Sequence, residues 1–125
     1  MRLLLDTQIL LWLVADDMRL STSARLRILD ATSVFISSAS IWEIAIKFRI
    51  GRLRLDPDDA IREIEINGFE ELPVRSRHAA AVGRLALLPS DPFDRLLIAQ
   101  AMLEPLHLLT ADASLMAYSD LVILV

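Results

Sequence analysis

Four acidic side chains stand where an apolar segment is expected to pass into a helix. They are Asp6, Glu43, Asp94 and Asp112. Asp6 directly follows an apolar run at the start of the chain, and Asp112 follows a second such run by three residues. We expect Glu43 and Asp94 in the first turns of helices. Carboxylates gathered in one place repel one another, and the usual relief is a hard divalent cation with oxygen ligands.

This combination of residue types favours phosphodiester hydrolysis. Carboxylates with Mg²⁺ or Mn²⁺, and no obvious protein nucleophile, can activate a water and neutralise the charge that develops on the phosphoryl oxygens. The chain has no cysteine, and its only histidines, His78 and His107, lie far apart in the sequence, which argues against a zinc site. We expect His107 to open a strand and His78 to face solvent on a helix, and we give neither a role.

Each acid also has an alternative interpretation as a helix cap. The segments 40–43 and 91–94 have the form of capping boxes, and Asp112 could cap a short helix of its own. Asp6 differs, because the Thr7 hydroxyl could cap the helix that follows it. A lone carboxylate at the end of a buried strand is costly, so Asp6 is the acid for which a functional role is best supported.

Short apolar runs alternate with helical segments throughout the chain. We expect strands at 3–5, 34–36, 69–74, 107–109 and 122–124. We expect helices at 7–15, 21–31, 40–50, from 57 onward, 76–87, 92–104 and 112–118. This alternation predicts right-handed crossovers and an α/β protein of one domain, residues 1–125, whose parallel sheet has helices on both faces. Sites in such sheets form at the carboxyl ends of the strands, where the four acids would meet.

The composition limits the protein classes that remain. The chain has 125 residues, of which 54% are apolar and 24% charged, and this excludes a disordered protein. The longest apolar run, 9–15, is far shorter than the ~20 residues that a membrane-spanning helix needs. Such an apolar excess in a small domain predicts an exposed apolar patch. We expect Leu26 and Leu29 to face inward on their helix, and Trp42 to lie in the core.

Charge gives a second constraint. The 17 acidic and 13 basic residues give a net charge of −4, the wrong sign for binding nucleic acid by bulk attraction. The segment 47–54 is a local exception, because it holds four basic residues and no acidic one, and Lys47 lies one helical turn beyond Glu43. The candidates for holding a nucleic-acid backbone are Lys47, Arg49, Arg52, Arg54 and Arg95. The alternative is a solvated helix end, where cations are favoured by the helix dipole.

Four blocks of the sequence resemble the PIN-domain family, and within it the VapC-type toxins of bacterial toxin–antitoxin pairs. The blocks are 3–7, 38–47, 91–101 and 109–112. They occur in the family's order and cover essentially the whole chain. The block that begins Asp91-Pro92-Phe93-Asp94 is quite specific, whereas a strand ending in Asp-Thr would be weak evidence alone.

The resemblance implies a five-stranded parallel sheet in the order 3-2-1-4-5 and an acidic pocket. Asp6 and Asp94 match the family's metal ligands best, Glu43 follows closely, and Asp112 is a fourth, more weakly engaged member. Thr7 and Thr110 resemble the hydroxyl residues that accompany these acids. The implied activity is that of an endoribonuclease that depends on Mg²⁺, with Mn²⁺ as a substitute. As a type II toxin it would form a homodimer and be silenced by a cognate antitoxin.

One departure from the family is visible, and other functions remain open. Many relatives carry a histidine shortly before the Asp-Pro-Phe-Asp block, where residues 88–90 here are Leu-Pro-Ser. A substrate contact from that position is therefore in doubt, although the metal site is not. The alternatives are a PIN-type processing nuclease that is not a toxin, and a non-catalytic protein-interaction module. A cytoplasmic location is expected, because Asp6 interrupts any signal peptide and the chain lacks cysteine.

Overall fold

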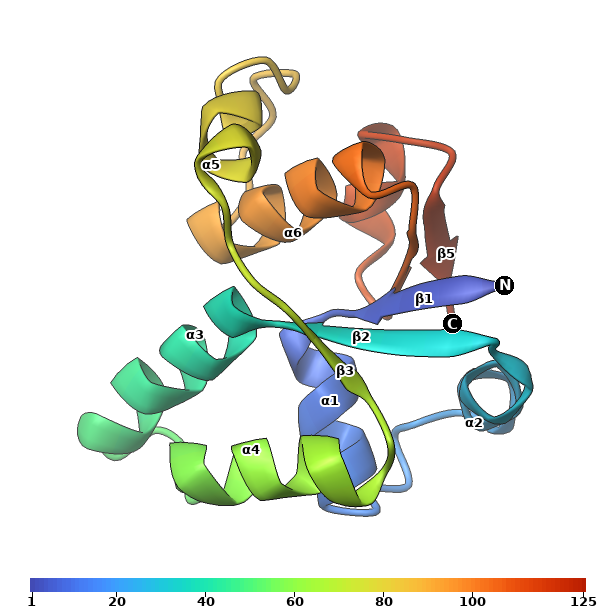
Figure 1. Ribbon diagram of the computed structural model, residues 1–125, viewed down its shortest axis with the longest axis vertical. Helices are drawn as coiled ribbons and strands as arrows, with labels where there is room; N and C mark the ends of the chain where they lie inside the picture. The colour runs from blue at the N-terminus through green and yellow to red at the C-terminus, as the bar shows by residue number, and fades with distance from the viewer.

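The computed structural model describes residues 1–125 and consists of a five-stranded parallel sheet with helices around it (Figure 1). The strands are β1 (Arg2–Leu5), β2 (Ser33–Ser37), β3 (Glu70–Leu72), β4 (His107–Thr110) and β5 (Val122–Leu124). The helices are α1 (Thr7–Val14), α2 (Thr22–Asp30), α3 (Ser38–Arg49), α4 (Pro57–Ile66), α5 (Ser76–Val82), α6 (Pro92–Leu103) and the 3-10 helix η1 (Ala113–Ala117). The strand order β3-β2-β1-β4-β5 confirms the predicted α/β topology.

The central strand β1 determines where a site can form. Leu4 pairs with Phe35 of β2 on one side and with Leu108 of β4 on the other. The strand order reverses at β1, because β2 and β3 extend from one of its edges and β4 and β5 from the other. The carboxyl ends of β1 and β4 therefore flank the point at which parallel sheets bind their ligands.

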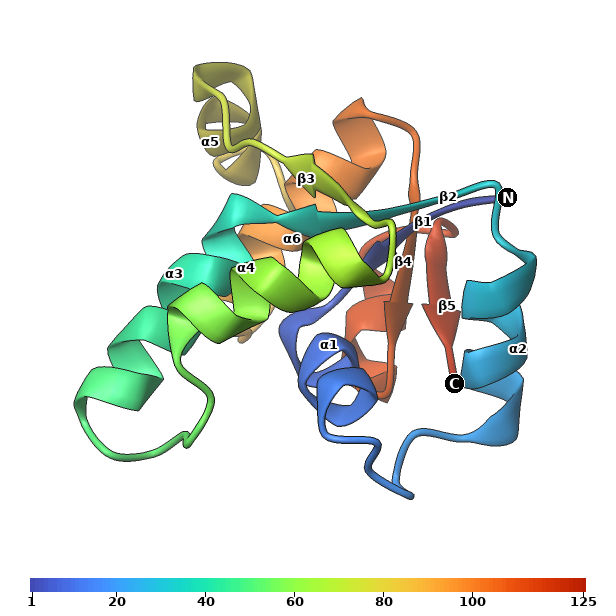
Figure 2. The same cartoon turned by 60° about the horizontal axis from the view of Figure 1, so that its bottom comes forward.

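Helices cover both faces of the sheet. In Figure 1 the sheet is seen nearly edge-on, with α5 and α6 on one side and α1, α2 and α4 on the other. Figure 2 shows the second group from closer to its own side, with α1 and α4 in front of the sheet. None of these helices combines the length and the apolar character needed to cross a membrane.

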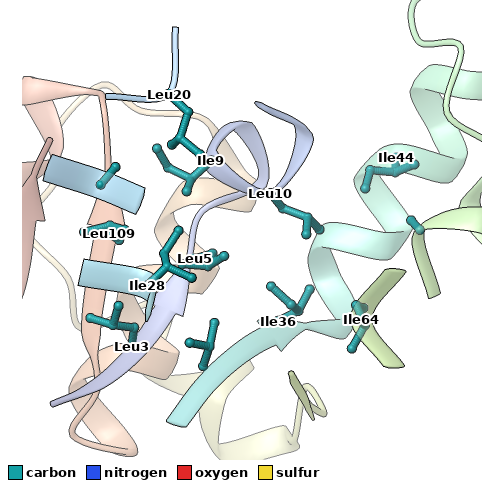
Figure 3. Packing of buried hydrophobic residues seen from close by; sticks show 13 residues of the cluster. Leu3, Leu5, Ile9, Leu10, Leu20, Ile28, Ile36, Ile44, Ile64 and Leu109 are labelled. Atoms are coloured by element: carbon teal, nitrogen blue, oxygen red, sulfur yellow. The ribbon is translucent and has the colours of Figure 1, made fainter. Parts of the chain in front are cut away.

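The apolar core is divided by the sheet into two clusters. Leu3 and Leu5 point into the larger cluster, together with Ile9 and Leu10 of α1 and Ile64 of α4 (Figure 3). Leu4 points the other way, toward Leu97 and Ile98 of α6. Successive side chains of a strand alternate between faces, so a strand buried on both sides reads as an unbroken apolar run. Each fully buried leucine contributes about 1.5–3 kcal/mol to stability.

The inward face of α2 differs from the prediction. Leu26 and Leu29 are exposed, and Ala24 and Ile28 are the buried residues. Ala24 and Ile28 are four apart and thus lie on one face of the helix, while Leu26 lies half a turn away. The small side chain of Ala24 lets the helix approach the core. The prediction was wrong because it placed the two larger apolar residues, the leucines, on the buried face.

Two helix starts also differ from the prediction. Asp6, not Thr7, caps α1, because its Oδ1 accepts a hydrogen bond from the Ile9 amide at 2.8 Å. Helix α3 begins at Ser38 with Ser37 as its cap, so segment 40–43 is no capping box and Glu43 lies in the second turn. The strand passes into the helix without a loop, which leaves no room for a later start. The predicted cap at Asp91 with Pro92 in the first position is confirmed.

Two aromatic side chains lie on the side opposite to that expected. His78 is fully buried between α5 and α6, where its Nδ1 accepts from the Arg75 amide at 2.9 Å. Trp42 is 61% exposed on α3, and its ring forms an edge-to-face pair with that of Phe93, with the ring centres 5.0 Å apart. The short helix α5 ends at Val82 and packs on α6, so the histidine is covered. Trp42 stays largely open to solvent, although it packs against Phe93 of α6.

Candidate active site

The candidate site is built on Asp6, at the carboxyl end of β1. Its side chain is buried, and both of its oxygens accept hydrogen bonds. Oδ1 accepts from the Ile9 amide, and Oδ2 accepts from the Thr110 hydroxyl of β4 at 2.5 Å. The Asp6 amide in turn donates to the Leu109 carbonyl at 3.1 Å. The end of β1, the start of α1 and the end of β4 therefore fix the orientation of this carboxylate.

Thr110 links Asp6 to Asp112 on the neighbouring strand. The Thr110 Oγ1 accepts from the Asp112 amide at 3.0 Å while it donates to Asp6. The Asp112 carboxylate is exposed at the N-terminus of η1, where its Oδ1 accepts from the amide and the hydroxyl of Ser114. Asp112 is thus a helix cap, as its alternative interpretation proposed, and it also faces the pocket described below.

Helix α3 brings a third acid to the same edge. Glu43 is buried, and its Oε2 accepts a hydrogen bond from Lys47 Nζ at 2.7 Å, one turn along the helix. The start of α3 is fixed against α1, because the Thr7 hydroxyl donates to Ser40 Oγ at 2.9 Å. Thr7 is therefore a positioning residue that joins two of the elements that carry the acids.

The start of helix α6 contributes two further acids. Asp91 caps the helix by accepting from the Phe93 amide at 2.7 Å, and Asp94 lies in the first turn. The acids of β1, α3, α6 and η1 all line a single pocket of about 490 Å³. Its five carboxylates, Asp6, Glu43, Asp91, Asp94 and Asp112, are accompanied by one cation, Lys47.

The electrostatics of the pocket follow from this crowding. Burial, together with the negative charges of Asp91, Asp6, Glu43 and Asp112, raises the pKa of Asp94 to about 7. Burial also raises the pKa of Asp6, against the opposing effect of the hydrogen bonds from Thr110 and Ile9. Carboxylates whose pKa values rise in this way lack a compensating positive charge, and such perturbation is typical of functional sites.

Comparison with known protein families identifies the fold. The sequence model of the PIN domain matches residues 3–121. The chain belongs to the PIN-domain family. The comparison with curated protein sequences gives no match.

Two solved structures share the architecture of this PIN domain at low sequence identity. One is the crystal structure of VapBC2 from Rickettsia felis bound to a DNA fragment from their promoter, with 16% identity and a TM-score of 0.70. That match covers 100% of this chain and 98% of the other. The second is a toxin–antitoxin complex from Klebsiella pneumoniae, with 19% identity and a TM-score of 0.64, which covers 96% and 94% of the two chains. These likenesses show the same fold.

The donor atoms of the PIN-domain pocket fit a hard divalent cation. Every candidate ligand is a carboxylate or hydroxyl oxygen, and of the five acids only Glu43 is paired with a cation. In their present rotamers, no three of these side chains form a cluster that would hold a metal ion. Mg²⁺ takes one or two carboxylates and keeps several waters, so it needs no such preformed cluster.

The five basic candidates separate into different places. Lys47 lines the acidic pocket, and Arg54 lines an adjoining groove between α1 and residues 53–55. Gln8, Leu11 and Trp12 line both cavities, so the groove continues the pocket. Arg49 and Arg52 are exposed and lie outside both.

Arg95 has a structural task that the sequence did not reveal. Its guanidinium donates to the carbonyl of Ala86, at 2.8 Å, and to the Tyr118 hydroxyl, at 3.1 Å. The Tyr118 hydroxyl donates to Ser90 Oγ at 2.7 Å, next to Asp91. These contacts attach the segment before α6 to the body of the PIN domain and hold Asp91 at the pocket.

Asp91 itself was missed as a pocket residue. Its spacing from Asp94 was the available signal, because residues three apart at a helix start lie on one side. Because a role as a helix cap was enough to explain Asp91, the sequence offered no further reason to place it in the site.

Proposed function

We propose that this PIN domain is a metal-dependent endoribonuclease and the toxin of a type II toxin–antitoxin pair. The observation that carries the proposal is the pocket at the carboxyl edge of β1 and β4, where five carboxylates face a single cation. Family membership supports nuclease chemistry at this place. The toxin assignment is supported by the two structural neighbours, both of which come from toxin–antitoxin complexes.

The residues that would hold Mg²⁺ or Mn²⁺ are Asp6, Glu43 and Asp94, with Asp112 as a fourth, more weakly engaged member. When bound, such an ion activates a water and neutralises charge on the phosphoryl group. The chain's own residues orient the donors. Ile9 and Thr110 each donate a hydrogen bond to one oxygen of Asp6. Ser114 donates to one oxygen of Asp112, and the second carboxylate oxygen of Asp112 has no hydrogen-bond partner.

The groove beside the pocket suits unpaired nucleotides. Trp12, Leu53 and Leu55 provide apolar surface, and Arg54 provides a positive charge for the backbone. Bases of single strands stack on aromatic side chains, and specific RNA recognition targets loops more than duplexes. The groove is short and local, in keeping with the net charge of −4 that disfavours broad RNA binding.

A homodimer and an antitoxin complete the proposal. Trp42 and Ile46 on α3, and Ile50 directly after it, are exposed and recur every four residues, which gives this segment an apolar stripe on its surface. Large apolar stripes on small proteins mark contact surfaces, and we assign this one to a second copy of the chain. Sedimentation or size-exclusion mass at several concentrations checks this assignment, and a monomer throughout contradicts it.

The test of the nuclease compares the wild type with Asp6→Asn. Asparagine caps helices as well as aspartate does, so the variant keeps the α1 start and loses the charge. We expect the wild type to cleave a loop-containing RNA with Mn²⁺ and to stop with EDTA. The variant should lose more than ~100-fold in rate, the upper cost of losing an outer-shell partner of a metal ligand.

Metal binding gives a second, independent readout. At a hundredfold excess of Mn²⁺ over its dissociation constant, the wild type should gain about 2.7 kcal/mol of stability in thermal unfolding, and the variant much less. A folded Asp6→Asn protein that cleaves like the wild type would refute the nuclease site. If neither protein responds to Mn²⁺ or cuts RNA, the interaction module replaces the enzyme.

Induced expression separates the toxin from a processing nuclease. A toxin should arrest growth, and coexpression of its antitoxin should restore it. The Asp6→Asn variant is the matched control, because it should be harmless while it still binds the antitoxin. Normal growth with an active wild-type nuclease would favour the processing enzyme.

A further inference from the structure

The single cation of the pocket is already engaged by one of the acids. Lys47 Nζ lies 2.7 Å from Glu43 Oε2, and the two residues stand one turn apart on α3. Glu43 is nearly covered, with a side chain that is 9% exposed, while that of Lys47 is 41% exposed. The other four acids of the pocket form no ion pair. The pair therefore ties up the Glu43 oxygen that the proposed chemistry needs.

The geometry of Lys47 allows it to serve two partners in turn. Its ammonium group has three donors, and only the one to Glu43 is in use. The ammonium is a point charge on a flexible stem, which can follow a phosphate oxygen without the fixed geometry of a guanidinium. Because the residue lines the pocket and is half-exposed, a phosphate placed there lies within its reach.

We propose that Lys47 is an internal counter-ion that holds Glu43 in the metal-free protein and moves to the RNA phosphate when the metal site fills. The inference rests on the proposed function. A divalent cation and an ammonium compete for the same carboxylate and repel each other, so Lys47 leaves Glu43 as the metal is taken up. The released ammonium then faces the backbone of the bound RNA.

This arrangement couples metal affinity to RNA affinity. The metal must break the Lys47–Glu43 pair, so the free protein binds it more weakly than the acids alone would allow. RNA that accepts Lys47 removes this cost and should tighten metal binding, and the coupling is reciprocal. The pocket would thus fill with metal chiefly when substrate is present.

The test measures Mn²⁺ binding by calorimetry in four proteins: wild type, Lys47→Met, Glu43→Gln and the double variant. Lys47→Met should bind Mn²⁺ about 5-fold more tightly than the wild type, the low end of typical coupling between sites. It should also raise KM for RNA at saturating Mn²⁺ more than it lowers kcat. In the Glu43→Gln background the same substitution should give no gain, because the competition acts through Glu43.

Two controls separate the pair from general electrostatics. Arg49→Met removes a charge from the same helix outside the pocket and should leave Mn²⁺ binding unchanged. Mn²⁺ should also bind the wild type more tightly in the presence of an RNA with a non-cleavable linkage, and this gain should vanish in Lys47→Met.

The outcomes are distinguishable. If the wild type binds Mn²⁺ but Lys47→Met binds it no better, or gains equally in the Glu43→Gln background, the inference is wrong and the proposed function stands. If the wild type neither binds Mn²⁺ nor cleaves RNA, the proposed function fails and the inference with it.

Discussion

Two polar clusters in this small protein use the same residue types in opposite ways. In the acidic pocket, Asp94 lies among other acids, and burial together with their charges raises its pKa to about 7. Between α5 and α6, Glu104 is surrounded by donors, and its pKa falls below the ordinary value. The hydrogen bond from His78 is the largest cause of that decrease, and the charge of Arg77 adds to it.

The difference lies in the hydrogen-bond donors and cations that surround each carboxylate. His78 Nδ1 accepts from the Arg75 amide, so its Nε2 carries the proton and donates to Glu104 Oε2 at 2.6 Å. Arg77 pairs with the same oxygen. In the pocket, Asp94 has no side-chain cation. A fully paired cluster stabilises the fold, and an unpaired one is left for a ligand.

Breaking the paired cluster should have the largest effect on stability. His78→Ala removes a buried ring and leaves the Arg75 amide and the Glu104 carboxylate without their partner. We expect the free energy of unfolding to fall by about 3 kcal/mol, as for other buried aromatic truncations, measured by urea denaturation. RNA cleavage by the folded protein should change less than twofold, because the cluster lies away from the pocket.

His107→Ala is the matched control. This histidine opens β4, is only partly buried and makes no side-chain hydrogen bond, so its loss should cost much less. Equal losses in the two variants would show that the His78 cluster has no special structural role.

Relieving the unpaired cluster should have a smaller effect of the opposite sign. Asp94→Asn removes the charge that the metal-free pocket disfavours, and we expect it to stabilise the protein in EDTA by about 1–2 kcal/mol at pH 8, after allowance for solvent screening. The pKa of Asp94 is about 7 in the folded protein, against an ordinary value of 3.8 for this carboxyl group. Wild-type stability is therefore lost as the pH rises from about 4 to 7.

The pH profile distinguishes this cause from a packing effect. The two proteins should melt alike below pH 4, where Asp94 is protonated in both states, and diverge up to about pH 7. A constant difference at every pH would exclude the charge as the cause. With saturating Mn²⁺ the order should reverse, because only the wild type offers the carboxylate.

Much of this fold could be predicted from the sequence, because its strands are buried on both faces. The run Leu3–Leu5 and its counterpart in β4 are unbroken apolar segments, which is the pattern of a central parallel strand. The four predicted acids reached one pocket because parallel strands end at the same edge of the sheet. Their convergence follows from topology and not from any local pattern.

The predictions that were wrong concern positions where contacts between distant elements decide whether a side chain is buried. His78 and Trp42 both lie on helices, and no local pattern shows which helix another element will cover. The Arg95 contacts with Ala86 and Tyr118 join segments that are distant in sequence. The Lys47–Glu43 pair was within reach of the sequence, since residues four apart share a helix face, but its position inside the pocket was not.

The smallest expected effect concerns Glu104, and it has the opposite sign to that of Asp94. Glu104→Gln can still accept from His78, but it loses the charge that Arg77 contacts. We expect a loss of about 0.5–1 kcal/mol at pH 7, typical of a partly exposed pair. Because the pKa of Glu104 is lowered on folding, its contribution is present above about pH 4.5 and is lost as the pH falls through the folded pKa. Melting curves of both proteins from pH 7 to pH 3 should converge in acid, whereas the Asp94→Asn pair diverges as the pH rises. If Glu104→Gln is instead the more stable protein at pH 7 and loses this advantage in acid, the charge of Glu104 is not compensated. The two clusters would then not differ in kind.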